Sequence, residues 1–231
     1  MNRSTLKKKS NLLKSTEIER LFAILSKHRP DPRIELDYTN PYTLLVAVIL
    51  SAQSTDKGVN KATARLFAIA DSPVKMIKLG EEGLKAYIKS IGLYNSKARN
   101  IIMMSQQLLE RFNGEVVEDF EGLCGLAGVG RKSANVIMNT VFGHPTIAVD
   151  THIFRVSNRL GLCVSKTPVQ TERALLKVVP LKWAHNAHHW LVLHGRYICK
   201  AKKPLCHDCP VAEICKHPVF TTGLKKEQIS V

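Results

Sequence analysis

The chain has 231 residues, 45% of them apolar, and carries 34 Lys and Arg against 19 Asp and Glu. An apolar fraction of this size can form a buried core, which excludes a chain that is mainly disordered. The longest apolar stretch, residues 42–52, contains Thr43 and Ser51 and is about half as long as a membrane-spanning helix. The formal net charge of +15 favours a polyanionic partner, most often nucleic acid, over a basic protein without such a partner.

The N-terminal segment, residues 1–14, contains five basic residues and no acidic residue, and no apolar stretch typical of a secretory signal follows it. Export is therefore not expected. An organelle transit peptide would share this composition, but the segment is short for one. We expect a disordered basic tail that adds non-specific attraction to phosphates.

Helical periodicity dominates the rest of the chain, without convincing period-2 alternation typical of a β-strand. Asn40 and Pro41 form an N-cap and a first helical position ahead of the apolar run at 44–50. Apolar side chains recur at helical spacing over 94–113, and Gly114 ends that helix. The pattern predicts an all-α fold of about ten short helices with short connections.

Three further helices are expected downstream. A short helix at about 118–125 precedes one at 130–142, which ends at Gly143. The last spans 151–160 and ends at Gly161. No change in composition marks a domain boundary among them.

The connection between the helices at 118–125 and 130–142 contains Gly128, Val129 and Gly130. Glycine permits a positive φ and lets a ligand approach the backbone, and the N–H groups that begin a helix attract anions. This combination is typical of a helix-hairpin-helix, which holds a nucleic-acid backbone without reading its bases. An ordinary tight turn explains the same glycines equally well.

Lys132 lies in the first turn of the helix after this hairpin, where the positive end of the helix dipole disfavours a protonated amine. Together with burial, this setting favours a nucleophilic lysine, and a lysine that only contacts phosphate is the alternative. Asp150 directly precedes the helix at 151–160, in the position of an N-cap. Capping alone explains an aspartate there, so its position does not establish catalysis.

Four cysteines with the spacing C-x6-C-x2-C-x5-C lie near the C-terminus: Cys199, Cys206, Cys209 and Cys215. Four thiolates suit either tetrahedral zinc or a [4Fe–4S] cluster, and the single C-x2-C pair favours the larger cluster. Such clustering indicates a metal site in a reducing compartment. The loop after the first cysteine carries Lys200, Lys202 and Lys203, which form either a phosphate contact or a solvated basic loop.

Several segments, together with the cysteine spacing, resemble the endonuclease III family of DNA base-excision glycosylases. The segments are SAQSTD (51–56), IGLYNSKARNI (91–101), GVGRKSAN (128–135), TIAVDTHIFRV (146–156) and HHWLVLHGRYIC (188–199). The resemblance runs from about residue 21 to residue 215 with almost no gaps, and the motifs together are highly specific.

The resemblance implies a two-domain, all-α helix-hairpin-helix DNA glycosylase fold. A six-helix barrel domain would span 34–144 and contain the helix-hairpin-helix at about 118–143. A discontinuous [4Fe–4S] cluster domain would combine 1–33 with 145–231, with the four cysteines as cluster ligands. Duplex DNA would lie across the cleft between the two domains.

The resemblance also implies a function. The enzyme would remove oxidised pyrimidines from duplex DNA and cleave 3′ to the abasic site by β-elimination through a lysine Schiff base. Lys132 would be the nucleophile and Asp150 the partner carboxylate, while Gln53 and Leu93 would fill the gap left by a flipped nucleotide. We expect a monomer at the nucleoid in the cytoplasm, whose partner is DNA with damaged pyrimidines or abasic sites, and no membrane association.

One position departs from the family pattern, in which the hairpin usually reads Leu-Pro-Gly-Val-Gly. Ala127 replaces the proline, and we expect the hairpin to lose pre-ordering worth about 0.4–1 kcal/mol. Three alternatives compete with the expected activity, and one of them is a zinc-stapled RNA-binding protein, which iron content and a brown colour would distinguish. An adenine-mismatch glycosylase shares the fold but lacks the hairpin lysine, and a non-catalytic, metal-stapled DNA-binding module would need neither Lys132 nor Asp150.

Overall fold

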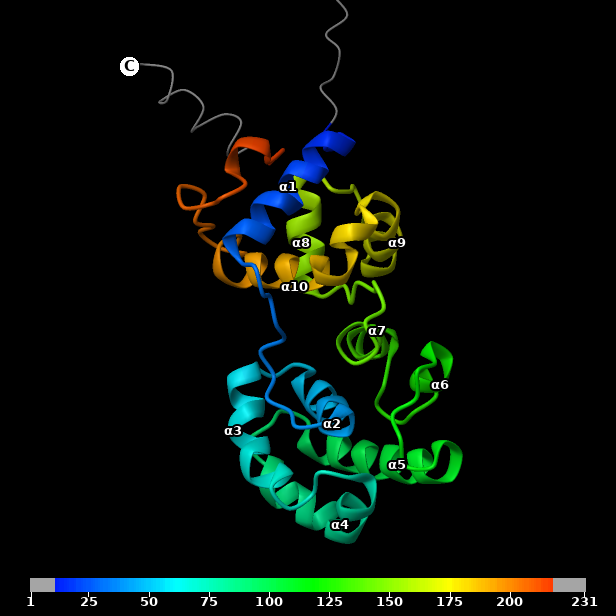
Figure 1. The fold of residues 1–231 in the computed structure, drawn as a ribbon. Helices are drawn as coiled ribbons and strands as arrows, with labels where there is room; N and C mark the ends of the chain where they lie inside the picture. Colours follow the sequence, from blue (N-terminus) through cyan, green and yellow to red (C-terminus); the bar gives the residue numbers. More distant parts are fainter. Residues whose placement is uncertain (1–10, 218–231) are drawn as a thin grey trace, which may run out of the picture. The chain divides into compact units, whose positions relative to one another are not determined.

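The computed structural model describes residues 11–217, and every regular element in that range is a helix (Figure 1). In chain order the elements are α1 (Ser15–His28), α2 (Pro41–Ser51), α3 (Asp56–Phe67), α4 (Pro73–Ile88), α5 (Tyr94–Phe112), α6 (Phe120–Cys124), α7 (Arg131–Thr140), α8 (Thr151–Leu160), α9 (Pro168–Val178), α10 (Leu181–Tyr197) and the 3-10 helix η1 (Ala212–Ile214). The predicted all-α fold is confirmed.

The chain divides into two compact units. Unit 2 is Arg33–Ala148 and contains the six helices α2–α7. Unit 1 combines the described residues 11–32 with 149–217 and contains α1, α8, α9, α10 and η1. The predicted boundaries, 34 and 144, differ slightly from the limits of unit 2.

The predicted helix ends agree with the structure where a cap defines them. α8 begins after Asp150 and ends at Gly161, which adopts a φ of 88°. α5 ends two residues before Gly114, because Asn113 already takes the left-handed conformation and the Gly114 N–H donates to the Leu108 carbonyl at 2.9 Å. α7 ends at Thr140, a little earlier than expected, and its closing turn runs on to Gly143.

The end of the predicted basic tail belongs to unit 1, which corrects the expected length of the tail. Leu13 is only 8% exposed, and its N–H donates to the Gly161 carbonyl at 2.8 Å. A buried leucine and a backbone hydrogen bond fix this part of the chain just before α1. Residues 1–10, which hold most of the basic side chains of the predicted tail, lie outside the described residues.

The helix α2 forms the centre of unit 2. All its residues from Tyr42 to Leu50 are buried, as expected for a helix that is apolar on every side. The Tyr42 hydroxyl lies 2.6 Å from the Ser105 hydroxyl of α5, so its buried polar atom has a partner. Because α2 contacts α3, α5 and α7, it holds together the elements on which the candidate site residues of unit 2 lie.

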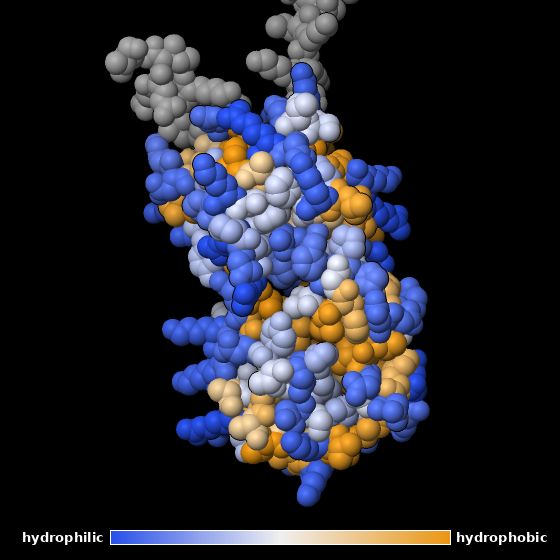
Figure 2. Space-filling view, in the orientation of Figure 1, coloured by the Kyte–Doolittle hydropathy of each residue, from blue (hydrophilic) through white to orange (hydrophobic). Residues whose placement is uncertain are grey.

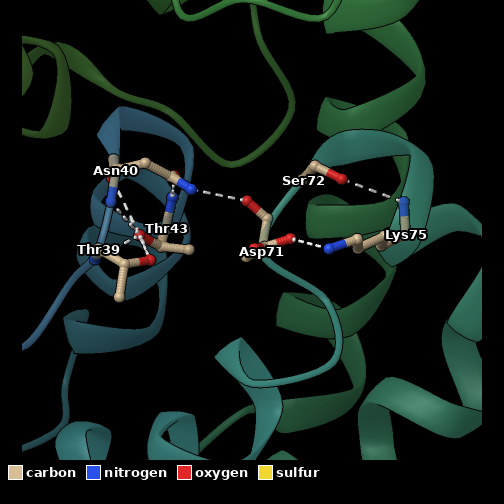
Figure 3. Close-up of polar contacts among 6 residues, drawn as sticks. All are labelled: Thr39, Asn40, Thr43, Asp71, Ser72 and Lys75. Atoms are coloured by element: carbon tan, nitrogen blue, oxygen red, sulfur yellow. Dashed lines mark hydrogen bonds and ion pairs between the residues drawn. The ribbon is translucent and has the colours of Figure 1, made fainter.

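Polar caps tie the start of α2 to the start of α4 (Figure 3). Asn40 accepts a hydrogen bond from the Thr43 N–H at 2.8 Å, and its amide nitrogen donates to the Asp71 carbonyl at 2.9 Å. Ser72 caps α4, whose Lys75 forms an ion pair with Asp71 at 2.8 Å. Both helices also begin with proline, so their starting points are fixed locally by the sequence.

Unit 1 is built around α10, which contacts both α1 and α8 (Figure 1). Trp190 of α10 packs against Phe22 of α1 with ring centroids 6.3 Å apart, and its indole N–H donates to the Arg29 carbonyl at 2.8 Å. A buried indole N–H needs a hydrogen-bond acceptor. This hydrogen bond joins the N-terminal segment of unit 1 to its C-terminal segment. Unit 1 therefore depends on contacts between segments separated by the whole of unit 2.

The visible face carries hydrophilic side chains over much of its area, with hydrophobic patches between them (Figure 2). Among the helices of residues 11–217, none is both long and apolar enough to cross a membrane.

Candidate functional site

The turn between α6 and α7 contains two glycines with different roles. Gly128 has a φ of +78°, and a Cβ built there would lie 2.9 Å from Asn100 Cβ, so the fold itself requires glycine. Gly130 has an extended backbone, and a Cβ there would meet no atom within 4 Å. Val129 between them is buried, with its N–H donating to the Leu126 carbonyl at 3.1 Å. The space beside Gly130 is thus open to a ligand from outside the chain.

The first turn of α7 follows this hairpin directly. Gly130 is its N-cap and offers no side chain to accept from the first N–H groups of the helix. Helix N-termini without a capping side chain suit anions, because N–H groups and the helix dipole both point at the ligand. The hairpin and the start of α7 together provide the geometry expected for holding a phosphate.

Ala127 has a hydrogen bond that the family's usual proline could not make. Its N–H donates to the Gln107 side chain of α5 at 2.7 Å. Proline lacks this donor, so the substitution exchanges a restricted backbone for a tie to the neighbouring helix. The expected loss of pre-ordering is therefore offset by a contact that sequence reasoning did not find, because Gln107 lies in a different helix.

Lys132 is the second residue of α7 and is exposed. The sequence-based expectation combined a helix start with burial, and the structure of the free protein provides only the helix start. The preceding Arg131 lies over the Phe120 ring, with its guanidinium carbon 5.1 Å from the centroid. Lys132 is thus presented to solvent beside the hairpin.

Asp150 caps α8, as predicted. Its Oδ1 accepts a hydrogen bond from the Ile153 N–H at 2.7 Å, and the residue is half-buried. Asp150 belongs to unit 1, whereas Lys132 belongs to unit 2. The cap fixes the orientation of the carboxylate at the start of α8.

Gln53 and Leu93 share an unusual backbone conformation. Both are exposed and have positive φ, 56° for Gln53 and 60° for Leu93. A left-handed conformation costs a non-glycine residue about 1–2 kcal/mol, and Leu93 also leaves 61% of its surface in water. The Cβ position of Gly92 lies 3.8 Å from the Gln53 carbonyl oxygen, so the two turns are neighbours. Strain and exposure at adjacent positions are typical of a functional surface.

Lys97 is a residue of this region that sequence reasoning missed. It lies in α5, is 5% exposed, and donates to the Leu50 carbonyl at 2.9 Å and the Ala52 carbonyl at 2.6 Å. Burial lowers its pKa from the ordinary lysine value. The available signal was its position four residues before Ile101, on the apolar face of the predicted helix.

The four C-terminal cysteines line one cavity of unit 1, as their spacing suggested. The apolar side chains of Leu160, Ile198 and Leu205 also line it, together with Arg159 and His194. His194 Nε2 lies 3.7 Å from Cys209 Sγ. In the described part of the chain, no group of three or more His, Cys, Asp or Glu side chains could hold a single metal ion.

The chemistry of this cavity fits an iron–sulfur cluster. Burial raises the pKa of the Cys209 thiol to about 11 and also raises that of Cys215. Thiolates in such an apolar cavity need positive charge beside them, which cluster iron supplies. The donor set of four cysteines therefore fits the cofactor that the sequence favoured.

Arg159 of α8 holds the loop between the first two of these cysteines. Its guanidinium donates to the carbonyls of Lys200 at 2.7 Å and Ala201 at 3.1 Å, and it also lies 3.6 Å from Cys199 Sγ. These bonds leave the three lysine side chains of the loop in solvent. The exposed lysines are Lys200, Lys202 and Lys203. Sequence spacing gave no sign of Arg159, because it belongs to a different element.

Two family models match the chain. Residues 46–181 match the HhH-GPD superfamily of base excision DNA repair proteins, and this range includes the hairpin, Lys132 and Asp150. Residues 199–215 match the iron-sulfur binding domain of endonuclease III. This matched range begins and ends at the first and last of the four cysteines that line the cavity.

Individual proteins agree with these models. Endonuclease III of Rickettsia conorii is 56% identical over 200 residues, which cover 87% of this chain and 95% of that protein. A non-covalent endonuclease III–DNA complex matches with a TM-score of 0.85 and 42% identity, over 93% of this chain and 100% of that one. A trapped endonuclease III–DNA covalent intermediate, an estranged-adenine complex, matches with a TM-score of 0.83 and 44% identity, over 88% and 96%. The chain therefore belongs to the endonuclease III family and is a base-excision-repair DNA glycosylase and abasic-site lyase with a [4Fe–4S] cluster.

Proposed function

We propose that this enzyme removes oxidised pyrimidines from duplex DNA, with Lys132 as the nucleophile and Asp150 as the carboxylate that stabilises developing positive charge. The observation that carries the proposal is the exposed Lys132 at the start of α7, next to a hairpin with open space at Gly130. A DNA strand held by the hairpin N–H groups would bring its sugar to this amine. The trapped covalent DNA intermediate of a 44% identical endonuclease III supports covalent chemistry in this chain.

Recognition begins with extrusion of the damaged nucleotide, because a base inside the duplex cannot be reached. A poorly paired base costs less to extrude, which favours damaged bases. The exposed side chains of Gln53 and Leu93 then fill the vacated space. Gln53 can hydrogen-bond the base left without a partner, while Leu93 acts as an apolar wedge between base steps.

The chemical step transfers the sugar from the base to Lys132. The Lys132 Nζ attacks C1′, and the bond from C1′ to the base breaks, so the base leaves with the electron pair and takes up a proton. Positive charge develops on the sugar, and the Asp150 carboxylate stabilises it. Loss of the amine protons and opening of the sugar ring give an imine between Lys132 and C1′.

Strand cleavage follows from the imine. The imine acidifies the C2′ proton, and removal of this proton drives β-elimination, in which the bond from C3′ to oxygen breaks. The 3′ neighbouring strand leaves with a 5′-phosphate. Water then hydrolyses the imine and regenerates the amine of Lys132 for another round.

Cys199, Cys206, Cys209 and Cys215 are the proposed cluster ligands. When bound, the cluster cross-links residues 199–215 through iron–thiolate bonds. Lys200, Lys202 and Lys203 then provide phosphate contacts from the loop that Arg159 holds. A cluster with four thiolate ligands requires a reducing compartment, which supports a cytoplasmic enzyme, and we propose that it acts as a monomer.

Borohydride trapping tests the nucleophile. The enzyme is incubated with a duplex that carries one oxidised thymine, with borohydride present, and the products are separated on a denaturing gel. We expect a covalent protein–DNA adduct with the natural enzyme and with Lys78→Ala, a matched loss of an exposed lysine on α4. Lys132→Ala should give neither adduct nor strand cleavage while it still binds DNA. Normal trapping by Lys132→Ala would refute the assignment.

The same gel separates the alternatives. Release of adenine from a mismatched duplex without an adduct would identify the adenine-mismatch activity instead. Binding without base release from any of the duplexes would identify the non-catalytic module. The exposed Lys132 beside the hairpin favours the lyase over the adenine-mismatch glycosylase and over the non-catalytic module.

A further inference from the structure

We propose that Lys97 is a positioning residue whose side chain fixes the Gln53 turn in the conformation with which Gln53 enters the DNA, and whose backbone N–H joins this turn to the Leu93 turn. The inference rests on the proposed function, in which these two exposed residues fill the gap left by the extruded nucleotide. It adds a buried residue that touches no DNA and links the two turns.

The ammonium group of Lys97 holds the Gln53 turn on both sides. It donates to the carbonyl of Ala52, the residue before Gln53, at 2.6 Å. It also lies 3.2 Å from the hydroxyl of Ser54, the residue after Gln53. A third bond, to the Leu50 carbonyl at 2.9 Å, fixes the last turn of α2, where helix carbonyls lack intrahelical partners. Gln53 is therefore the free position between two anchored neighbours.

The backbone of the same residue holds the Leu93 turn. The Lys97 N–H donates to the Leu93 carbonyl at 3.1 Å, which is the first hydrogen bond of α5. The Ser96 hydroxyl donates to the same carbonyl at 3.0 Å. Through its side chain and its backbone, Lys97 thus connects the two left-handed residues of this surface.

The chemistry of lysine matches this task. An ammonium group has three N–H donors, and the structure provides three oxygen acceptors for them. None of these acceptors is a carboxylate, so the buried Lys97 side chain is held by hydrogen bonds to neutral oxygens rather than by an ion pair. An apolar side chain of equal length would fill the same space but release the carbonyls of the Gln53 turn.

When the two turns are fixed before DNA binds, the affinity rises for a duplex in which an extruded or missing base has left a space. Residues already held in a strained conformation do not have to be ordered when they bind. Without Lys97, the backbone at Gln53 is free to relax from the left-handed region to a more common conformation. Contacts with intact duplex, which depend on phosphates, do not need this conformation.

The test uses a duplex with a tetrahydrofuran abasic analogue opposite 2-aminopurine. The analogue cannot form an imine, so the measurement is independent of Lys132 chemistry. Insertion of side chains into the gap changes 2-aminopurine fluorescence, and titration gives the affinity. Lys97→Met removes the donors at similar length, and Lys78→Met is the matched control for the lost charge.

For Lys97→Met we expect about tenfold weaker binding to the analogue duplex and a smaller fluorescence change at saturation, because pre-organisation is lost. Affinity for an intact duplex should equal that of Lys78→Met. Ser54→Ala removes one of the three acceptors and keeps the two bonds to backbone carbonyls, so it should show the same loss in smaller measure. The fluorescence at saturation reports only folded, bound molecules, so a general loss of stability in Lys97→Met would not imitate the effect.

Two further variants separate this inference from the proposed function. Gln53→Ala and Leu93→Ala should each reduce the fluorescence change. If neither does so, the gap-filling function is wrong and the role of Lys97 is wrong with it. If both do so while Lys97→Met and Ser54→Ala match the natural enzyme, only the role of Lys97 is overturned.

Discussion

The carboxylate of Asp150 caps α8, and we propose a second task for it in catalysis, which a single substitution can separate from the first. As an N-cap it needs only an oxygen that accepts the Ile153 N–H. As a stabiliser of positive charge on the sugar it needs the full negative charge. Asparagine retains the first property and loses the second, because asparagine and aspartate are similar N-caps.

Asp150→Asn should therefore unfold at the same temperature as the natural enzyme but release the damaged base about 10²-fold more slowly, as expected when one charge-stabilising group is removed. Single-turnover base release and thermal unfolding measure the two effects. Asp119→Asn is the matched control, because Asp119 caps α6 in the same manner without a proposed catalytic task. Full activity of Asp150→Asn would reduce Asp150 to its capping role.

The two glycines of the hairpin give a second prediction for single residues. Gly128→Ala places a Cβ 2.9 Å from Asn100 in a backbone with a φ of +78°, and should cost about 1–3 kcal/mol of unfolding free energy. Gly130→Ala meets no atom of the chain and should cost only about 0.5 kcal/mol, the difference between two N-cap residues. Its methyl group instead occupies the open space beside the hairpin.

The two variants should show the opposite order in their affinity for DNA, compared at equal concentrations of folded protein: Gly130→Ala should lose more affinity than Gly128→Ala. Gly130→Ala should weaken binding to intact duplex, because a phosphate can no longer approach the backbone, and a binding titration of folded protein measures this. Equal affinity of Gly130→Ala and the natural enzyme would show that no phosphate approaches the hairpin at that position.

At the scale of elements, the hairpin is tied to α5 by one side-chain hydrogen bond. Gln107 accepts from the Ala127 N–H at 2.7 Å and so links the turn before α7 to the helix that begins with Leu93 as its N-cap. Because proline would remove this donor, Ala127 and Gln107 form a pair. In this chain the hairpin is therefore fixed by a hydrogen bond to α5, whereas the usual family hairpin is fixed by the restricted backbone of proline.

A double-mutant cycle measures the pair. Gln107→Ala should cost about 1 kcal/mol of unfolding free energy, because it removes one hydrogen bond and leaves a half-buried N–H without its partner. In an Ala127→Pro background the same change should cost almost nothing, since the donor is already absent. Denaturant unfolding of the four proteins gives the coupling energy, and a coupling of zero would contradict the role of Gln107.

The elements differ in how far the sequence determines them. Asn40 with Pro41 and Asp150 with Gly161 defined helix limits correctly, because caps and stops act on their own chain neighbourhood. Lys97, Gln107 and Arg159 were missed, since each acts on another element through its side chain. Leu13 was placed in a disordered tail for the same reason, because its partner Gly161 is distant in sequence. Helix caps and stops could be predicted from the sequence because they depend on neighbouring residues. Contacts between elements could be identified only from the three-dimensional structure.

At the scale of the whole molecule, the net charge of +15 favours binding to the phosphates of DNA. Bound lysines release counterions from the phosphates, so affinity falls steeply with salt. The exposed lysines of the loop belong to unit 1, and the hairpin belongs to unit 2. The proposed reaction likewise needs residues of both units, Lys132 from one and Asp150 from the other.

The salt dependence of binding tests the loop. Replacing Lys200, Lys202 and Lys203 together by alanine should lower the slope of log affinity against log salt by about one unit for each lysine that contacts a phosphate. Titrations of an intact duplex at several salt concentrations measure the slope. Lys61, Lys78 and Lys89, exposed lysines of unit 2, serve as a triple-alanine control with the same loss of charge. An equal slope in the natural enzyme and the loop variant would show that the loop does not face DNA.

The discontinuity of unit 1 has a consequence for the order in which the protein forms on the ribosome. Translation delivers α1 first, with an apolar face that includes Leu21, Phe22 and Leu25. Its packing partner α10 is synthesised only after all of unit 2. The apolar face of α1 therefore has no partner on the nascent chain while Arg33–Ala148 emerges from the ribosome and can fold around α2. The cysteines follow later still. Unit 2 can therefore complete its core before unit 1 can close and before iron can be inserted, and α1 is the segment that a chaperone would have to shield in the meantime.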